Sequence, residues 1–370
     1  MSTQSSPPAS SLPGGASVAD YFKGAPARYR HMGTPFYAAL AERCAVDPEI
    51  LELAANAGNG QPPTHLLMGA VQYLLLRQKD AELARYYASL TPDPAPAAAA
   101  FEPFRAFCRE NRTALVDILR TRTVQTTIVG RAGHLLPAMA HAARQADGEP
   151  LTLIEVGCSA GLLTLFDHYR YDFGTLGQVG PVDGPPVTSC RFDPAPPLPI
   201  IMPRIANRIG VDLNPIDATD PEERRWIEAL LPPDWQAERA QIRTALDYRA
   251  RTPFPIQRGD AMQVVPALLK DSRGPVCVLH SHCLYQWPAD AQAAFEAMLS
   301  EASRGRVLHR VGVELLPEEQ SGRSWRAEAA RTGNVEFDVF HIEYRDGAQR
   351  FTLLASADGW GRQARWLAAN

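Results

Sequence analysis

Residues 151–166, LTLIEVGCSAGLLTLF, decide the fold of this chain. A short apolar run ends in Glu155, a turn containing Gly157 and Gly161 follows, and an apolar helical pattern then resumes. This order predicts a strand, a tight turn and a helix. Because glycine has no Cβ, backbone N–H groups in such a turn can approach the phosphate or carboxylate end of a nucleotide-like ligand. Many strand-to-helix turns contain two glycines, so the motif needs support from the rest of the chain.

Three further apolar runs end in polar residues at predicted strand tips. RIGVDLNPID ends at Asp212, FPIQRGDAM reaches Asp260, and PVCVLHSHCLYQWP offers the segment from His280 to Tyr285. An acid at the tip of the second strand of a nucleotide-binding α/β fold accepts hydrogen bonds from ribose hydroxyls. A fifth strand is expected at RVLHRVGVELL, followed by a hairpin around Arg345-Asp346-Gly347.

In this order, the strand ends resemble the class I S-adenosylmethionine (SAM) methyltransferase fold. That resemblance implies that the E-x-G-x-x-x-G turn holds the methionine part of SAM, the second acid holds ribose, and the G-D-A tip meets adenine. The dehydrogenase pattern G-x-G-x-x-G is absent, since Cys158 and Ser159 directly follow Gly157. We therefore expect an α/β, Rossmann-type sheet of seven strands.

Three regions are expected along the chain. Residues 1–16 form a disordered tail, residues 17–147 form a helical N-terminal domain, and residues 148–370 form the SAM-binding Rossmann-like domain. A segment rich in proline and glycine, at about residues 174–205, is inserted between the first two strands of that domain. Long irregular segments are usually functional lids or poorly ordered. For this insertion a lid, a small β excursion and disorder all stay open.

Composition limits the classes of function. The chain is 45% hydrophobic and 21% charged, which is typical of a packed globular protein. A net charge of −4 gives no reason to expect nucleic acid or an anionic membrane as a partner. The six cysteines contain no C-x-x-C spacing, and the start of the chain lacks the pattern of a signal peptide. We expect a cytoplasmic location and a small-molecule substrate, while the sequence leaves the oligomeric state open.

Several phrases resemble a bacterial family described only as a domain of unknown function. They are TPFYAALAERCAVD, RTRTVQTTIVGRAGHLLPAM, EVGCSAGLLTLFDHYRYDFG, GVDLNPIDATDPEERRWIEAL and GDAMQVVPAL, and the similarity covers about residues 30–320. The resemblance implies a SAM-methyltransferase-type core behind a helical N-terminal region, without a known activity. Members typically read Q-T-N-E where residues 125–128 read QTTI, and S-A-G-L-N-L where Leu163 and Thr164 stand. These departures suggest a specialised substrate.

The chain is also similar to the bacterial azetidine-2-carboxylate synthases of peptide natural-product pathways. That resemblance implies that SAM is itself the substrate: the amine of its methionyl part attacks the γ-carbon of the same chain, and methylthioadenosine leaves. No phrase of the sequence separates this cyclisation from methyl transfer to a small acceptor. In both reactions the protein must hold the nucleophile unprotonated and in line with the carbon, and must keep water out.

Candidate site residues follow from these motifs. Tyr171 could cradle the sulfonium cation, and His282 or Tyr285 could accept a proton. Their plain alternatives are core packing for Tyr171 and a buried, hydrogen-bonded histidine for His282. Asp212 and Asp260 could also simply cap local turns. The residues expected to bind SAM are Gln125, Arg131, Glu155, Gly157, Ser159, Gly161, Asp212, Leu213, Asn214, Asp217, Asp260, Ala261, His280 and Ser281.

Other chemistries stay open. The HSHC run at 280–283 shows no third and fourth ligand at a recognisable spacing, so no metal is expected. The stretch from Gly157 to Gly161 also fits G-x-S-x-G, in which Ser159 would be the nucleophile of a serine hydrolase. Its partners would be Asp260 and either His309 or His341, although no H-G-G-G phrase is present. A third possibility is a SAM-binding protein without catalytic activity.

Overall fold

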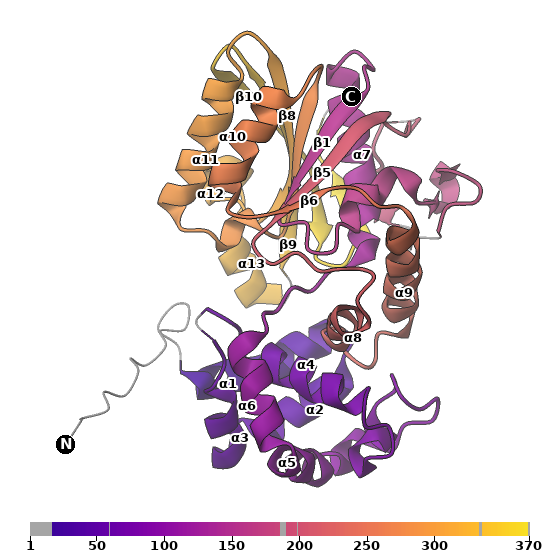
Figure 1. The fold of residues 1–370 in the computed structure, drawn as a ribbon, viewed down its shortest axis with the longest axis vertical. Coiled ribbons are helices and arrows are strands. Elements are labelled where there is room, and N and C mark those ends of the chain that lie inside the picture. Colours follow the sequence, from indigo (N-terminus) through magenta and orange to yellow (C-terminus); the bar gives the residue numbers. More distant parts are fainter. Residues whose placement is uncertain (1–16, 59, 186–189, 198, 333–334, 369–370) are drawn as a thin grey trace, which may run out of the picture. The chain divides into compact units, whose positions relative to one another are not determined.

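The structure is a computed structural model that describes residues 17–58, 60–185, 190–197, 199–332 and 335–368. The tail expected at residues 1–16 lies outside this described part. The chain divides into two compact units (Figure 1). One unit comprises the chain up to Thr126 together with Glu222–Arg239, and the other comprises Thr127–Pro221 together with the chain from Ala240 onward. The helical unit therefore includes a segment, Glu222–Arg239, that lies far downstream of the domain boundary expected at residue 147.

The first unit is helical. Asp47 caps α3, since its Oδ1 accepts hydrogen bonds from the amides of Glu49 and Ile50 at 3.0 Å each. Helix α4 is buried on nearly all sides, and within it Gln72 donates to the carbonyl of Ala229 at 2.8 Å. The helices are α1 (Val18–His31), α2 (Pro35–Cys44), α3 (Pro48–Ala54), α4 (Pro63–Leu75), α5 (Phe101–Glu110), α6 (Arg112–Thr121), α8 (Pro221–Ala229) and the first residues of α9 (Gln236–Arg251).

The second unit is built on a nine-stranded sheet of order β4-β11-β10-β9-β8-β7-β1-β5-β6. Five neighbouring strands, from β6 to β8, pair in parallel, and β9 and β10 continue the sheet as an antiparallel hairpin. The strands are β1 (Leu151–Val156), β4 (Arg191–Phe192), β5 (Ile205–Asp212), β6 (Ile256–Arg258), β7 (Val276–Ser281), β8 (Val307–Glu314), β9 (Glu336–Arg345), β10 (Ala348–Asp358) and β11 (Gln363–Trp366). The expected mixed α/β class and largely parallel sheet are confirmed.

Helices cover both faces of this sheet. Figure 1 shows α10 (Ala261–Asp271) and α11 (Ala289–Ala302) on one side and α7 (Ala132–Gln145) on the other. Ile154 of β1 belongs to the apolar core that α10 and α11 share with the sheet. On the opposite face, the Sγ atom of Cys277 in β7 lies 3.9 Å from Sδ of Met139 in α7. Because strand side chains alternate between the two faces, the central strand β1 is buried along its whole length.

The number of strands differs from the seven expected. The inserted segment contributes β4, which pairs in parallel with β11, and β11 extends the sheet beyond the hairpin strand β10. The insertion also forms β3 (Gln178–Val179), which pairs with β2 (Tyr171–Asp172) in a separate two-stranded sheet. The prediction of seven strands was therefore wrong, because short edge strands of two to four residues carry too little periodicity to be seen in a sequence.

The helix expected directly after Gly161 is also absent, since the structure has a kinked 3-10 segment, η5 (Leu163–His168), at that place. Two buried tyrosines account for the difference. Tyr169 donates its hydroxyl to the carbonyl of Leu162, and Tyr171 donates to that of Phe166, each at 2.6 Å. These carbonyls would accept backbone N–H groups in a continued α-helix. Here each carbonyl accepts a tyrosine hydroxyl in addition to a 3-10 amide, from Leu165 at 3.4 Å and from Tyr169 at 3.3 Å, and the chain turns into β2.

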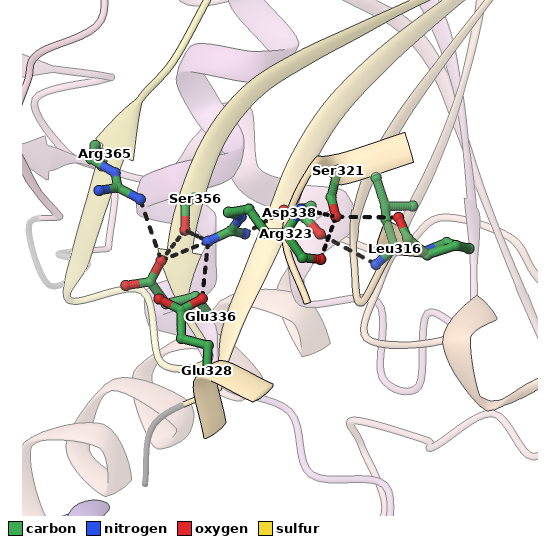
Figure 2. Close-up of polar contacts among 9 residues, drawn as sticks. Leu316, Ser321, Arg323, Glu328, Glu336, Asp338, Ser356 and Arg365 are labelled. Atoms are coloured by element: carbon green, nitrogen blue, oxygen red, sulfur yellow. Dashed lines mark hydrogen bonds and ion pairs between the residues drawn. The ribbon is translucent and has the colours of Figure 1, made fainter. Parts of the chain in front are cut away.

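The connection from β8 to β9, which contains α12 (Glu318–Ser321) and α13 (Trp325–Thr332), is held by an ion-pair cluster (Figure 2). Arg323 lies 2.8 Å from Glu336 Oε2 and also pairs with Asp338, whose other oxygen accepts the amide of Leu316 at 3.3 Å. This cluster ties the connection to the start of β9. Within the described part of the chain, no helix has the length and apolar character to span a bilayer.

Candidate functional site

The parallel strands β6-β5-β1-β7-β8 have the sequential order 3-2-1-4-5 of a doubly wound sheet. In such a sheet the order reverses between the first and fourth strands, and ligands bind outside the carboxyl ends of the strands at this point. Here the reversal lies between β1 and β7, which pair directly. The predicted site residues at the ends of β1, β5 and β7 therefore come together at one edge, as their positions in the sequence indicated.

In the loop after β1, every second residue has a left-handed backbone conformation. Gly157, Ser159 and Gly161 have φ angles of 72°, 53° and 73°. A Cβ atom on Gly157 would lie 2.5 Å from Sγ of Cys283, and one on Gly161 would lie 2.5 Å from the ring of Phe254. Close packing against neighbouring loops is thus sufficient to require both glycines. Ser159 adopts the same conformation at a cost in strain, which is a common property of functional loops.

Asp212 connects the loops after β1 and β5. Its carboxylate is 8% exposed, and it accepts the amide of Ser159 at 2.7 Å and the amide of Asn214 at 2.8 Å. The Oγ atom of Ser159 is buried and has no hydrogen-bond partner among the described residues. Next to the acid, the side chain of Leu213 is 65% exposed. The tip of β5 thus presents an acid and an apolar side chain beside an unsatisfied hydroxyl.

The other predicted residues near β5 and β6 have local roles. Asn214 accepts a hydrogen bond from Arg258 at 3.2 Å, and the exposed Asp217 accepts the amide and hydroxyl of Thr219 at 2.7 Å each. Asp260 caps α10 by accepting the amide of Met262 at 2.9 Å. Of the two roles predicted for this residue, this is the capping role. Ala261 follows as the buried first residue of that helix.

Glu155 is a buried carboxyl group near the end of β1. It is 2% exposed and accepts a hydrogen bond from the hydroxyl of Thr164. Burial raises the pKa of Glu155 to about 8, with a smaller contribution from Asp212, while the bond from Thr164 acts in the opposite direction. The carboxyl is therefore protonated at neutral pH.

His280 lies inside the sheet with both ring nitrogens engaged. Arg310 Nε donates to Nε2 of His280 at 2.8 Å, and Nδ1 lies 2.7 Å from Glu314 Oε1. An arginine can only donate, so Nε2 is the unprotonated acceptor and Nδ1–H donates to the carboxylate. Burial, followed by the charge of Arg310, lowers the pKa of His280. This histidine is therefore neutral and fixed in one tautomer.

Glu314, at the end of β8, organises the loop that follows β7. Besides His280, its carboxylate accepts the amides of Cys283, Leu284 and Tyr285, each at 3.1 Å. Glu314 is not among the site residues predicted from the sequence. The sequence contains a pattern that could have predicted it, because Glu314 lies near the end of the fifth expected strand, as Glu155 and Asp212 lie at the ends of the first and second.

His282 and Tyr285 occupy the loop after β7. His282 has a φ of 56°, stacks on Phe337 with ring centroids 3.7 Å apart, and its Nε2 atom is buried without a hydrogen-bond partner in the described part of the chain. Burial lowers the pKa of His282 far below its usual value, and Arg131 and His134 add to this effect. Its ring is therefore a neutral imidazole and a weaker base than an ordinary histidine. The Oγ atom of Ser281 is likewise buried and unsatisfied, and Tyr285 is 38% exposed.

Two predicted site residues lie elsewhere. Tyr171 is fully buried, donates to the carbonyl of Phe166 and stacks on Phe173 with ring centroids 5.6 Å apart. Its surroundings match the core-packing alternative. Gln125 belongs to the helical unit, where it accepts a hydrogen bond from Thr123 at 3.2 Å, so its part in a SAM site stays a prediction. Arg131 is buried at the start of α7 and donates through Nε to the carbonyl of Gly359 at 2.8 Å.

The residues proposed for a serine hydrolase are engaged separately. Nδ1 of His309 lies 3.1 Å from Nε2 of His341, so these two rings bond to one another. Asp260 caps α10, and Ser159 Oγ makes no hydrogen bond to a described residue. A hydrolase nucleophile needs a base within hydrogen-bond reach. Within the described ranges, no group of three or more His, Cys, Asp or Glu side chains is placed to hold a metal ion.

The family comparison covers nearly the whole chain. The bacterial family described as "uncharacterized protein conserved in bacteria (DUF2332)" matches residues 21–366. The chain belongs to this family. No curated protein matches it. The family description assigns no reaction, so the chemistry of the site has to be argued from the residues at the carboxyl edge of the sheet.

Proposed function

We propose that this member of the family is a SAM-utilising enzyme that catalyses nucleophilic displacement at the SAM sulfonium. Its core would then be a variant of the class I methyltransferase fold, acting in bacterial small-molecule metabolism in the cytoplasm. The observation that carries the proposal is the position of Glu155 and Asp212. Glu155 is the penultimate residue of β1 and Asp212 is the last residue of β5, and these strands are adjacent and parallel beside the point where the strand order reverses. The backbone amide of Ser159, in the glycine-containing loop after β1, donates to Asp212.

The residues around Asp212 fit the nucleoside part of SAM. Asp212 lies at the end of the second parallel strand, and a carboxylate accepts hydrogen bonds from ribose hydroxyls. The exposed side chain of Leu213 offers an apolar surface for one face of adenine. The buried and unsatisfied Oγ of Ser159 offers a polar contact in the loop that faces the same edge.

The chain supplies positioning and proton handling for such a reaction. SAM itself, when bound, supplies a sulfonium that activates its adjacent carbons. The loops after β1 and β7 pack so closely that a Cβ on Gly157 would clash with Cys283, which excludes water between them. Nε2 of His282 is buried and has no partner among the described residues, so it is the acceptor we propose for the proton that a nucleophilic amine or hydroxyl loses, although its lowered pKa makes the ring a weak base.

The two reactions make the same demand on these residues. Methyl transfer requires an acceptor atom aligned with the methyl carbon, whereas cyclisation requires the amine of SAM aligned with its own γ-carbon. Azetidine-2-carboxylate and methylthioadenosine would be the products of the second reaction. The proposal includes both, and a single measurement separates them.

The purified protein should be incubated with SAM alone and the products followed by mass spectrometry. Methylthioadenosine together with a four-carbon cyclic amino acid would establish cyclisation. SAM that stays intact but raises the melting temperature would favour a methyltransferase that needs its acceptor, or a SAM-binding protein without activity; a screen of small amine and hydroxyl acceptors separates these. If SAM is not turned over and does not raise the melting temperature, the proposal is refuted.

A further inference from the structure

His134 is a buried histidine that has no hydrogen-bond partner among the described residues. It lies in the first turn of α7, is 1% exposed, and has both Nδ1 and Nε2 unsatisfied. A neutral imidazole always carries one N–H group, and burying that donor without an acceptor is unfavourable. The ring is therefore placed to donate to an acceptor that the described protein groups do not supply.

Arg131 precedes His134 by one helical turn and is a buried cation without an ion pair in the described part of the chain. It is 8% exposed, and its side chain donates from Nε to the neutral carbonyl of Gly359. Glu314 and Asp358 are close enough to act on Arg131 electrostatically. However, Glu314 accepts His280 and three backbone amides, and Oδ1 of Asp358 accepts three backbone amides of its own loop. A buried guanidinium without a paired anion is costly.

His282 completes the group. A Cβ on Gly359 would lie 3.5 Å from Cε1 of His282, and the carbonyl of the same glycine accepts the bond from Arg131. The charge of Arg131 lowers the pKa of both His134 and His282. Gly359 thus lies beside both Arg131 and His282, and Nε2 of His282, like both ring nitrogens of His134, is buried without a partner among the described residues. The positive φ of His282 shows that the loop bears strain to hold the ring there.

We propose that Arg131, His134 and His282 form a buried subsite for the carboxylate group of a small ligand. The guanidinium fork matches the two oxygens of a carboxylate, and the neutral imidazole of His134 donates its N–H to one of them. Arg131 has no carboxylate in direct contact among the described residues and can therefore take a monoanion, whereas a phosphate dianion would place a second negative charge near Glu314 and Asp358. The class of ligand is therefore a carboxylate.

The identity of the ligand, but not the subsite, rests on the proposed function. The carboxylate belongs either to the methionyl part of SAM or to a second, amino-acid-like substrate. His134 has no place in the sequence motifs. It joins the site only because α7 carries it onto the face of the sheet beside the loop after β7.

The subsite can be tested without turnover. The protein is labelled with 13C at histidine Cε1 and titrated with sodium acetate, with sodium chloride at equal ionic strength as the reference. Saturable shifts of the His134 and His282 signals are expected with acetate and not with chloride, and His134→Gln and His282→Gln assign the two signals. Arg131→Gln should weaken acetate binding at least tenfold, and Arg131→Lys should weaken it less, because lysine keeps the charge but loses the fork.

The exposed Arg345, which pairs with Glu343, provides the matched control, and Arg345→Gln should leave the acetate shifts unchanged. The absence of a saturable shift with acetate would overturn the proposal. So would shifts that persist unchanged in both Arg131 variants. Using two Arg131 variants keeps the test decisive if one of them fails to fold.

SAM and decarboxylated SAM then distinguish the source of the carboxylate. If SAM shifts both histidine signals and decarboxylated SAM does not, the carboxylate is that of SAM. If both compounds bind alike and acetate still shifts the signals, the subsite takes the carboxylate of a second substrate. If acetate shifts the signals and neither form of SAM binds, the subsite stands while the proposed function fails.

Discussion

The backbone amide of Ser159 donates to Oδ2 of Asp212 at 2.7 Å, and this bond joins two loops that are 53 residues apart in the chain. Ser159 can present its amide in this direction because it adopts a φ of 53° between two glycines with positive φ. The other carboxylate oxygen accepts the amide of Asn214 in the next loop. Asp212 therefore fixes the positions of both loops, and it also lies at the proposed ribose site.

We expect Asp212→Asn to reduce SAM affinity by about 10- to 100-fold, the equivalent of one hydrogen bond to a charged group. The amide retains an acceptor for one loop but presents an NH2 group to the other. Isothermal titration calorimetry measures the change. Asp346→Asn is the control, since Asp346 is exposed in the β9–β10 turn and accepts the amide of Gly305 there. Equal affinities of the Asp212 variant and the wild type would refute the ribose assignment.

Gly157→Ala should destabilise the protein by about 3 kcal/mol, through a left-handed φ and overpacking against Cys283. Gly174→Ala is a matched control, because Gly174 also has a positive φ but no atom lies within 4 Å of a Cβ built there. That variant should cost only about 1 kcal/mol, the strain of the φ angle alone. Urea unfolding measures both. If the two variants lose the same stability, the close approach of the loops after β1 and β7 is not what requires glycine.

Glu314→Gln should lower the free energy of unfolding by about 3 kcal/mol, since the carboxylate is buried and accepts four donors. A glutamine side chain turns one acceptor oxygen into a donor that faces N–H groups. Glu301→Gln removes an exposed carboxylate that pairs with Arg304, and it should change stability by less than about 1 kcal/mol. Chemical denaturation at pH 7 compares the two, and a loss as small for Glu314 as for Glu301 would contradict the proposed organisation of the loop after β7.

Stability should fall steeply in mild acid. Burial lowers the pKa of His134 to about 3, that of His309 to about 4 and that of His341 to about 2. In the unfolded chain these histidines bind a proton below a pH of about 6.5, and in the folded chain they do not. The unfolded state therefore binds more protons below this pH, and each such group lowers the free energy of unfolding by up to about 1.4 kcal/mol per pH unit.

The window of this loss extends from about pH 6.5 down to about pH 4 for His309, where the folded protein also takes up the proton. Unfolding free energies measured by urea titration from pH 7 to pH 5 test the expectation. His341→Gln should reduce the pH slope, and His31→Gln, at an exposed position, should leave it unchanged. A stability that is flat between pH 7 and pH 5 would show that these rings are not buried as neutral groups.

Ser159→Ala separates the proposed function from a serine hydrolase. A fluorophosphonate should not label Ser159 in the wild-type protein, because no base lies within hydrogen-bond reach of its Oγ among the described residues. The Ser159→Ala variant supplies the unlabelled reference. Covalent labelling of the wild type at Ser159, confirmed by peptide mass spectrometry, would instead establish the nucleophile of a hydrolase.

The sequence by itself determined the parallel core and its edge. Apolar runs that end in Glu155, Asp212 and His280 predicted three strands, and the structure has a strand at each place. These signals are local, because a strand buried on both faces must be apolar throughout and its polar tip marks where burial ends. The same locality explains the failures: the two-residue strand β4 and the tyrosine bonds that replace a helix after Gly161 depend on partners elsewhere in the chain.

Only the tertiary structure decided which side chains share an environment. Arg131 contacts Gly359 across 228 residues, and Gly157 is required as glycine by Cys283. His134 reads in the sequence as one residue of an amphipathic helix, and its unsatisfied ring becomes visible only when its neighbours are known. Local sequence patterns thus predicted which types of side chain lie at the strand tips. The partners, the burial and the protonation state of these side chains depend on which distant segments pack together.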